Sequence, residues 1–310
     1  MCLCGSTRSA PSRPLGHHGT WRFDLETLRI RFGSGRKVPA LLRALGQCSV
    51  PLAAVREVDF HPGNRKHGWR LRLRLLEGAD PYLPLKTTGH AEDFTPLLLT
   101  GPRDRELVAE YCAERLTESV QYARELLETP LDPVQAAKGL VARLPFHART
   151  GEGSAFFNGE RLRLQWDGWI ASIPKGEEEA REFPFEEIES LQWFPSVGLE
   201  EGYLRVVPRG VTVPEKPELE NDFCTLASHG LKGSEESLLM AATVNTHIAL
   251  AGRGASQETA GAPAELTAPR PADDSAAIFA KIRELGSLHS EGLLTDSEFS
   301  TKKAELLDRL

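Results

Sequence analysis

The chain contains the same segment twice, and this duplication constrains its fold more than any other feature of the sequence. Three blocks align at a constant spacing of 133 or 134 residues: 23–30 with 157–164, 50–63 with 183–196, and Gly68-Trp69 with Gly202-Tyr203. Self-similarity at a fixed spacing is the mark of an internal repeat. We therefore expect both copies to share one fold.

Each copy has the pattern of β-strands followed by a helix. From Trp69 to Leu75, apolar residues alternate with Arg70, Arg72 and Arg74. A period of two is typical of an antiparallel strand with one face on the core and the other in water. Helical patterns follow at 104–127 in the first copy and at roughly 234–250 in the second. The sequence predicts a mainly β fold with some helix: two tandem PH-like antiparallel barrels, each ending in a helix.

The segment 275–310 has the pattern of a helical hairpin. Ile278, Ile282 and Leu285 share one helical face, and the run 295–298 (TDSE) fits a capping box that starts a second helix. A unit below ~40 residues usually needs a metal, disulfides or a partner to fold, and this one has no Cys and a single His. We expect a partner protein or a second copy to bind its apolar residues: Ile278, Ile282, Leu285, Leu293, Leu294, Phe299 and Leu306.

These patterns divide the chain into five parts. They are a disordered tail at 1–19, a basic PH-like domain at 20–129, an acidic PH-like domain at 135–252, a flexible linker at 253–274 and the hairpin at 275–310. The linker is rich in Ala, Pro, Gly and Thr and has few large apolar groups, so burial cannot offset the entropy of ordering it.

Several of these segments also resemble known families. IRELGSLHSEGLLTDSEFSTKKAELL, near the C-terminus, is similar to the SHOCT domain, a short C-terminal domain of many bacterial proteins. WRFDLETLRIRF, VPLAAVREVDFHPG, GWRLRLRLLEGADPY and REFPFEEIESLQWFP resemble an actinobacterial family of unknown function with tandem PH-like domains and a C-terminal SHOCT domain. The resemblance implies the fold, and an interaction or oligomerisation role for the hairpin without catalytic residues.

The two copies carry opposite charge. Residues 21–75 hold twelve basic and four acidic side chains, a net charge of +8, whereas residues 150–222 hold seven basic and sixteen acidic ones, a net charge of −9. Opposite potentials favour docking of one copy on the other. The basic copy could instead bind anionic lipid headgroups or nucleic-acid phosphates, or its arginines could simply form the solvated face of a sheet. The candidate residues for docking or anion binding are Arg65, Lys66, Arg70, Arg72 and Arg74.

The sequence offers little that would support catalysis. No Ser/His/Asp, Cys/His or phosphate-loop motif occurs, and neither a cofactor nor a metal site is expected. Five cysteines at scattered spacings form no disulfide framework, so reduced thiols and a cytoplasmic location are expected. No apolar run of ~18 residues predicts a transmembrane helix. The sequence thus favours a non-enzymatic binding or assembly protein that associates through the hairpin, the alternative being an anionic-ligand binder that works through the basic copy.

Overall fold

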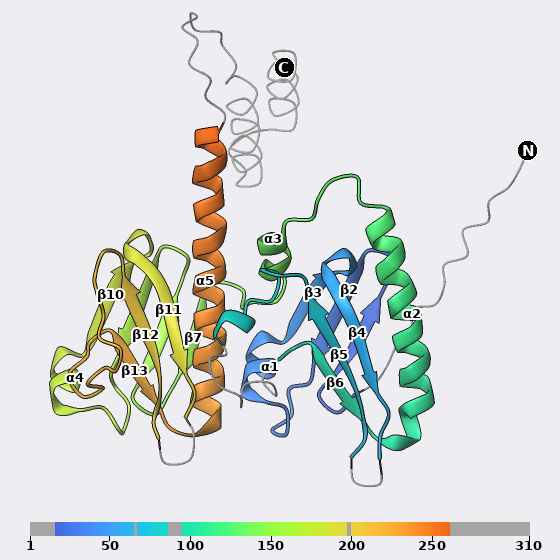
Figure 1. Ribbon diagram of the computed structural model, residues 1–310. Coiled ribbons are helices and arrows are strands. Elements are labelled where there is room, and N and C mark those ends of the chain that lie inside the picture. Colours follow the sequence, from blue (N-terminus) through green and yellow to red (C-terminus); the bar gives the residue numbers. More distant parts are fainter. Residues whose placement is uncertain (1–15, 65–66, 86–94, 197–199, 261–310) are drawn as a thin grey trace, which may run out of the picture. The chain divides into compact units, whose positions relative to one another are not determined.

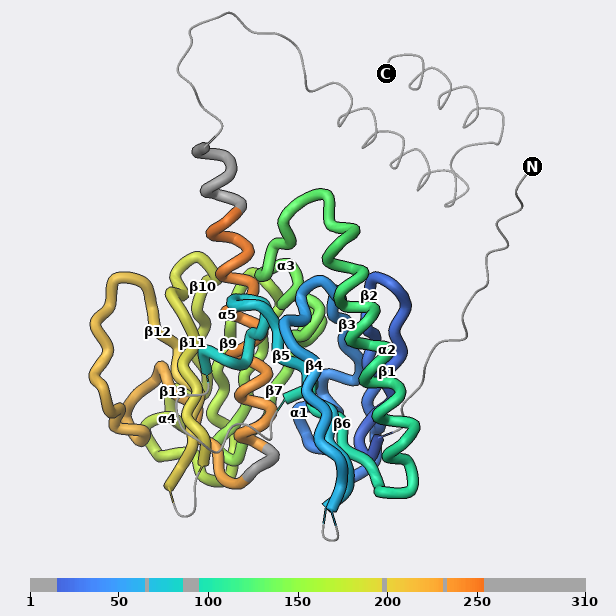
Figure 2. Tube along the Cα trace, turned by 45° about the vertical axis from the view of Figure 1, so that its right-hand side comes forward, coloured from blue at the N-terminus to red at the C-terminus, as the bar shows by residue number. Residues whose placement is uncertain are grey.

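A computed structural model describes residues 16–64, 67–85, 95–196 and 200–260. Both copies of the repeat, and the segment that connects them, belong to one compact unit that ends at Gln257. Figures 1 and 2 show the strands of the two copies with helix α5 beside them in both views.

The first repeat consists of two three-stranded antiparallel sheets and a long helix (Figure 1). The first sheet has the order β1-β2-β3 and the second the order β4-β5-β6. The elements are β1 (Gly19–Phe23), β2 (Thr27–Phe32), α1 (Ala40–Leu45), β3 (Gln47–Pro51), the 3₁₀ turn η1 (Leu52–Ala54), β4 (Val55–His61), β5 (Trp69–Leu75), η2 (Leu83–Leu85), β6 (Leu98–Gly101), η4 (Arg103–Arg105) and α2 (Glu106–Glu125).

The second repeat follows the same order and adds one strand. Its sheets have the orders β10-β9-β8-β7 and β11-β12-β13. After the short helix α3 (Pro133–Lys138) come β7 (Phe146–Arg149), β8 (Ser154–Phe157), β9 (Arg161–Gln165), α4 (Ile173–Glu178), β10 (Ala180–Pro184), η5 (Phe185–Glu187), β11 (Ile188–Phe194), β12 (Gly202–Pro208), β13 (Thr225–Ser228) and α5 (Gly230–Ala260). From β2 and β9 to β5 and β12, equivalent elements start 133 or 134 residues apart, as the duplication predicts.

The predicted closed barrels are wrong, whereas the mainly β character and the helix after each set of strands are confirmed. Within the described residues each repeat has two separate sheets, and no strand ladder joins them. The chain passes from β3 to β4 through the 3₁₀ turn η1, which interrupts strand pairing at that corner. In the first repeat, buried side chains such as Trp21 and Leu71 and the buried face of α2 share one apolar core. Side-chain packing therefore joins the sheets where a barrel would need a hydrogen-bonded seam.

Helix α5 is covered on all sides over two turns. Every residue from Ser237 to Val244 is buried, the pattern of a helix enclosed by protein. Upstream, its Glu235 carboxylate accepts a hydrogen bond from the Leu41 amide of the first repeat at 3.0 Å. The hydroxyl of Thr243 accepts one from the Ala142 amide of the connecting segment at 3.1 Å. Helix α5 therefore belongs to the core of its own repeat and also contacts the preceding one.

A buried ion pair sits in the second repeat. The Lys175 side chain is fully buried, and its Nζ donates to Glu152 Oε1 at 2.9 Å and to the carbonyl and hydroxyl oxygens of Thr225 at 3.1 Å each. Burial lowers the pKa of Lys175 from its usual value, although Glu152 opposes this effect. Helix α1 holds buried Leu42 at the equivalent position, so the two repeats fill one site with different chemistry.

The ends of the predicted domains shift where the structure describes them. Gly16 already donates to the carbonyl of Gly19, where β1 starts, so the predicted tail of 1–19 overlaps ordered chain. Helix α5 runs to Ala260, so the predicted linker begins inside this helix. The remainder of the linker and the hairpin at 275–310 lie outside the described residues. Within the described part of the chain, no helix has both the length and the apolar character to cross a membrane.

Candidate anion-binding groove

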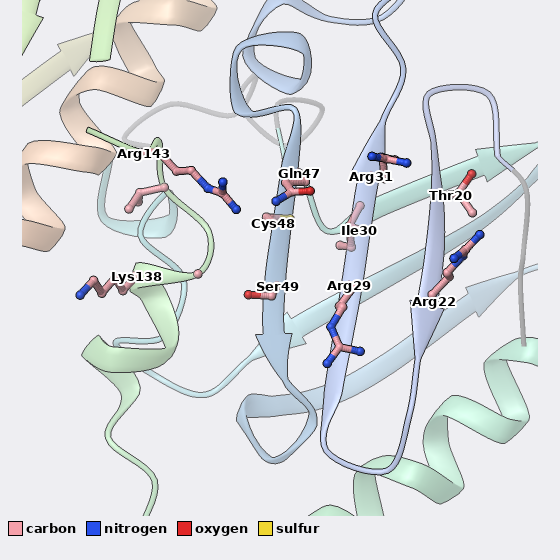
Figure 3. A pocket seen from close by; sticks show the side chains of 12 residues that line it. Thr20, Arg22, Arg29, Ile30, Arg31, Gln47, Cys48, Ser49, Lys138 and Arg143 are labelled. Atoms are coloured by element: carbon pink, nitrogen blue, oxygen red, sulfur yellow. The ribbon is translucent and has the colours of Figure 1, made fainter. Parts of the chain in front are cut away.

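A groove of about 490 Å³ lies between the first sheet and the segment that connects the repeats (Figure 3). Five basic side chains line it, all of them exposed, and its lining includes no acidic residue. They are Arg22, Arg29, Arg31, Lys138 and Arg143. Such a cluster attracts anions, because nothing in the lining neutralises it.

The sheet wall of the groove follows from strand alternation. Trp21 on β1 and Leu28 and Ile30 on β2 are buried in the core, so the residues between and beside them point to the other face of the sheet. In the antiparallel register Arg22 lies directly opposite Arg29. Like charges opposite each other destabilise a sheet. The arginine face therefore costs the fold some stability, which is typical of residues kept for binding.

The β1–β2 turn orients one of these arginines. Asp24 Oδ1 accepts hydrogen bonds from the amides of Glu26 at 2.9 Å and Thr27 at 2.8 Å, which forms the turn. Its Oδ2 accepts from Arg29 Nη1 at 2.7 Å. Partial burial acts to raise the pKa of Asp24, but the two amides and the guanidinium outweigh it, so the pKa lies below its usual value. Arg29 is thus partly neutralised and fixed in place.

The other four cations are uncompensated. Arg22, Arg31, Lys138 and Arg143 have no ion pair among the residues that the structure describes. The positive charge of Lys138 contributes, after burial, to lowering the pKa of His247 on α5. The groove therefore offers four cations that an incoming anion can pair with.

The second wall is the connecting segment, which is fastened to the first repeat. Asp132 caps α3 by accepting from the Val134 amide at 2.9 Å, and Pro133 occupies the first helical turn. After the helix, the carbonyl of Gly139 accepts from the Ser49 amide on β3 at 2.9 Å. A Cβ at Gly139 would lie 2.1 Å from the Ser49 carbonyl oxygen, so only glycine permits this approach. The contact holds Lys138 beside the sheet.

A buried tyrosine anchors the same wall. The Tyr82 hydroxyl donates to the carbonyl of Leu140 at 2.7 Å, and the Tyr82 side chain is fully buried. On its far side the segment reaches α5, because the Ala142 amide donates to Thr243. Arg143 follows directly, so both repeats determine its position.

The equivalent face of the second repeat lacks this character. Phe156 lies opposite Arg163 there, in the register that Arg22 and Arg29 have in the first repeat. Glu182 on β10 pairs with Arg161 at 3.2 Å and lies 4.0 Å from Arg163. An aromatic ring and a carboxylate thus replace part of the basic face, and the anion-binding arrangement is specific to the first repeat.

The arginine stripe singled out from the sequence lies on another sheet. Arg70, Arg72 and Arg74 alternate with buried residues along β5, as predicted. Arg72 lies opposite Asp59, and Arg74 pairs with Glu57 at 3.4 Å. The acidic residues of β4 thus offset much of the stripe. A role for the stripe in docking or anion binding stays a prediction.

The remaining predicted site residues are not placed. Arg65 and Lys66, and the apolar hairpin residues from Ile278 to Leu306, lie outside the described residues. Among the residues that are described, no three His, Cys, Asp or Glu side chains gather in a way that could hold a metal ion. Cys48 lines the groove, but burial raises the pKa of its thiol, so the thiolate form is disfavoured.

Sequence reasoning counted part of the groove and missed the rest. Arg22, Arg29 and Arg31 contributed to the net charge of the first copy, and their alternation along β1 and β2 could have placed them on one face. Lys138 and Arg143 fall between the repeats and carry no local signal. Only the contact of Gly139 with β3 brings them to the sheet.

Comparison with known proteins places the chain in a family without assigning an activity. No curated protein matches it significantly. The family described as "Domain of unknown function (DUF4429)" matches residues 21–117 and 155–245, which together make up more than half of the chain. The two matched segments begin 134 residues apart, in agreement with the duplication. The chain therefore belongs to the DUF4429 family and carries its domain twice.

Proposed function

We propose that the first repeat binds a compact ligand with several negative charges, such as a multiply phosphorylated molecule or headgroup, in the basic groove. The observation that supports this most is the convergence of five cations on one groove whose lining holds no acid. Guanidinium groups suit phosphate because their fixed donors match its oxygens in pairs.

The lining of the groove favours phosphate groups over single-stranded nucleic acid. Proteins that bind single strands stack the bases on aromatic side chains. None of the residues that line the groove is aromatic. Gln47, Ser49 and Thr20 supply neutral hydrogen-bonding groups between the cations instead, as expected of a site that surrounds a small polar anion.

The test compares two arginines on different sheets of the full-length protein. Arg31→Gln removes a groove cation, and glutamine already occupies the equivalent position, Gln165, of the second repeat. Arg74→Gln is the matched control on β5. Tripolyphosphate binding is measured by titration calorimetry at several salt concentrations, and sedimentation with anionic phospholipid vesicles tests whether a headgroup is the source.

Arg31→Gln should weaken binding by about fivefold, since each cation near an anionic group contributes ~1 kcal/mol. Higher salt should weaken binding by the wild type as well. Arg74→Gln should bind like the wild type. No binding of either probe by the wild type, or loss of binding in Arg74→Gln alone, would refute the groove as the site.

Association through the hairpin remains a separate prediction. Its residues lie outside the described part of the chain, so its support is the apolar pattern and the resemblance of the sequence. A pull-down and light scattering with and without residues 275–310 test it directly. Equal oligomer size and equal partners in both proteins would refute it.

A further inference from the structure

Helix α2 has an exposed apolar stripe on the side opposite the core. Its buried residues, among them Ala109, Cys112 and Leu116, face the sheets, and α2 packs on β4, β5 and η1. In Figure 1 the helix lies along the outer side of the first repeat. Leu107 is 81% exposed and Tyr111 58%. Contiguous apolar surface of this kind marks interaction sites in soluble proteins.

The stripe runs the length of the helix on one face. At 100° per residue its members fall within a sector of about 100°, well away from the buried face. They are Leu107, Tyr111, Arg115, Glu118, Tyr122 and Leu126, all of them exposed. Two of the four tyrosines of the chain lie in it, and tyrosine is enriched in protein interfaces because its rigid ring supplies contact area at low entropic cost.

The order of residues in the stripe is palindromic. Read from either end, the apolar and aromatic positions are leucine, tyrosine, tyrosine and leucine, and a charged pair of opposite sign lies at the centre. In the monomer this pair is joined, with Arg115 Nη1 2.6 Å from Glu118 Oε2. A palindromic stripe is complementary to itself when two helices pack antiparallel, as a two-fold axis requires.

We infer that α2 is the interface of a symmetric dimer, in which two copies of the chain pack their α2 helices antiparallel. In this register Leu107 faces Leu126 of the second copy and Tyr111 faces Tyr122. Arg115 then faces Glu118, and the symmetry makes this ion pair twice. The register matches charge and apolar positions at once, which argues for a second copy as the occupant.

The equivalent helix of the second repeat supports the need for a cover. Helix α5 is buried on all sides over 237–244 and receives the first repeat on its outer side. Among the described residues nothing covers the stripe on α2 in this way, and its six residues stay exposed. The acidic residues Glu110 and Glu125 flank the stripe and repel their own copies across the axis, so the dimer belongs to the weak, transient class.

The decisive experiment uses two charge-reversal variants of the full-length protein. Arg115→Glu gives the stripe two acids and Glu118→Arg gives it two bases. Each variant alone places like charges across the axis, whereas a mixture of the two restores opposite charges at both sites. Val211→Glu, at a residue that is 53% exposed on a loop of the second repeat, is the control. Sedimentation velocity over a concentration series measures association, and circular dichroism confirms folding.

The wild type and Val211→Glu should show the same concentration-dependent dimer step. Each charge-reversal variant should associate about tenfold more weakly or worse, and the equimolar mixture should recover the step as a heterodimer. A wild type that stays monomeric at all concentrations overturns the inference, as do single variants that associate like the wild type. If the hairpin at 275–310 or another protein covers the stripe, mixing restores nothing, and the inference is overturned as well.

Discussion

The buried lysine of the second repeat provides the sharpest test of how the fold is stabilised. Lys175 has no exposed surface, and its ammonium donates to Glu152 and to two oxygens of Thr225. In Lys175→Met these three contacts are lost, and the Glu152 carboxylate stays buried with the Ala227 amide as a donor. Removing one partner of a buried pair costs about 3–5 kcal/mol, because the other charge is left uncompensated. At about 2–4 °C per kcal/mol, the thermal midpoint should fall by roughly 10 °C.

Leu42→Met is the matched control, because Leu42 fills the equivalent buried position of the first repeat. A volume-conserving apolar exchange should cost less than about 1.5 kcal/mol. Urea unfolding, followed by tryptophan fluorescence and circular dichroism, measures both variants. The double variant Lys175→Met/Glu152→Gln should cost less than the two single changes together, since the second change removes a charge already left unpaired. A Lys175→Met protein within about 1 kcal/mol of the wild type, or strictly additive costs, would refute this reasoning.

Three further predictions follow from the contacts described above. Gly139→Ala places a Cβ against the Ser49 carbonyl and should weaken tripolyphosphate binding in calorimetry, whereas Gly176→Ala on α4, where a Cβ meets no atom within 4 Å, should bind normally. Because burial holds the folded-state pKa of Lys175 below 10.5, the unfolded chain retains this proton to higher pH. The free energy of unfolding of the wild type relative to Lys175→Met should therefore rise as the pH approaches 10.5, and a constant difference in urea titrations from pH 7 to 10.5 would contradict this. Limited proteolysis read by mass spectrometry should cut first between 261 and 274, where the sequence predicts a linker; protection equal to that of the strands would count against it.

Local periodicity carried most of the fold. Strand β5 was found because Trp69, Leu71 and Leu73 alternate with arginines, and their burial confirms the pattern. The duplication was found because equivalent elements kept their spacing through two copies. Closure into barrels could not be read in the same way, because it depends on whether distant edge strands pair, which no local pattern records.

The candidate sites show the same division. The apolar residues of α2 were visible in the sequence, but Leu107 and Tyr111 differ from Leu116 only in the side of the helix that meets the sheets. The connecting segment contributes two cations to the groove through one backbone hydrogen bond between Gly139 and Ser49. Such a contact spans 90 residues of the chain, and it follows from packing of the whole unit.

The fastening of the connecting segment bears on how the groove arose in evolution. Three of its five cations belong to the first repeat, and the other two lie on a stretch that exists only because two repeats are joined in tandem. The Tyr82 hydroxyl holds this stretch on one side and Thr243 on the other. An ancestor with one copy had no such stretch and no second helix to support it. On this view duplication supplied a new wall at the junction, and natural selection could then diverge the two sheet faces, one retaining its arginines and the other acquiring Phe156 and Glu182.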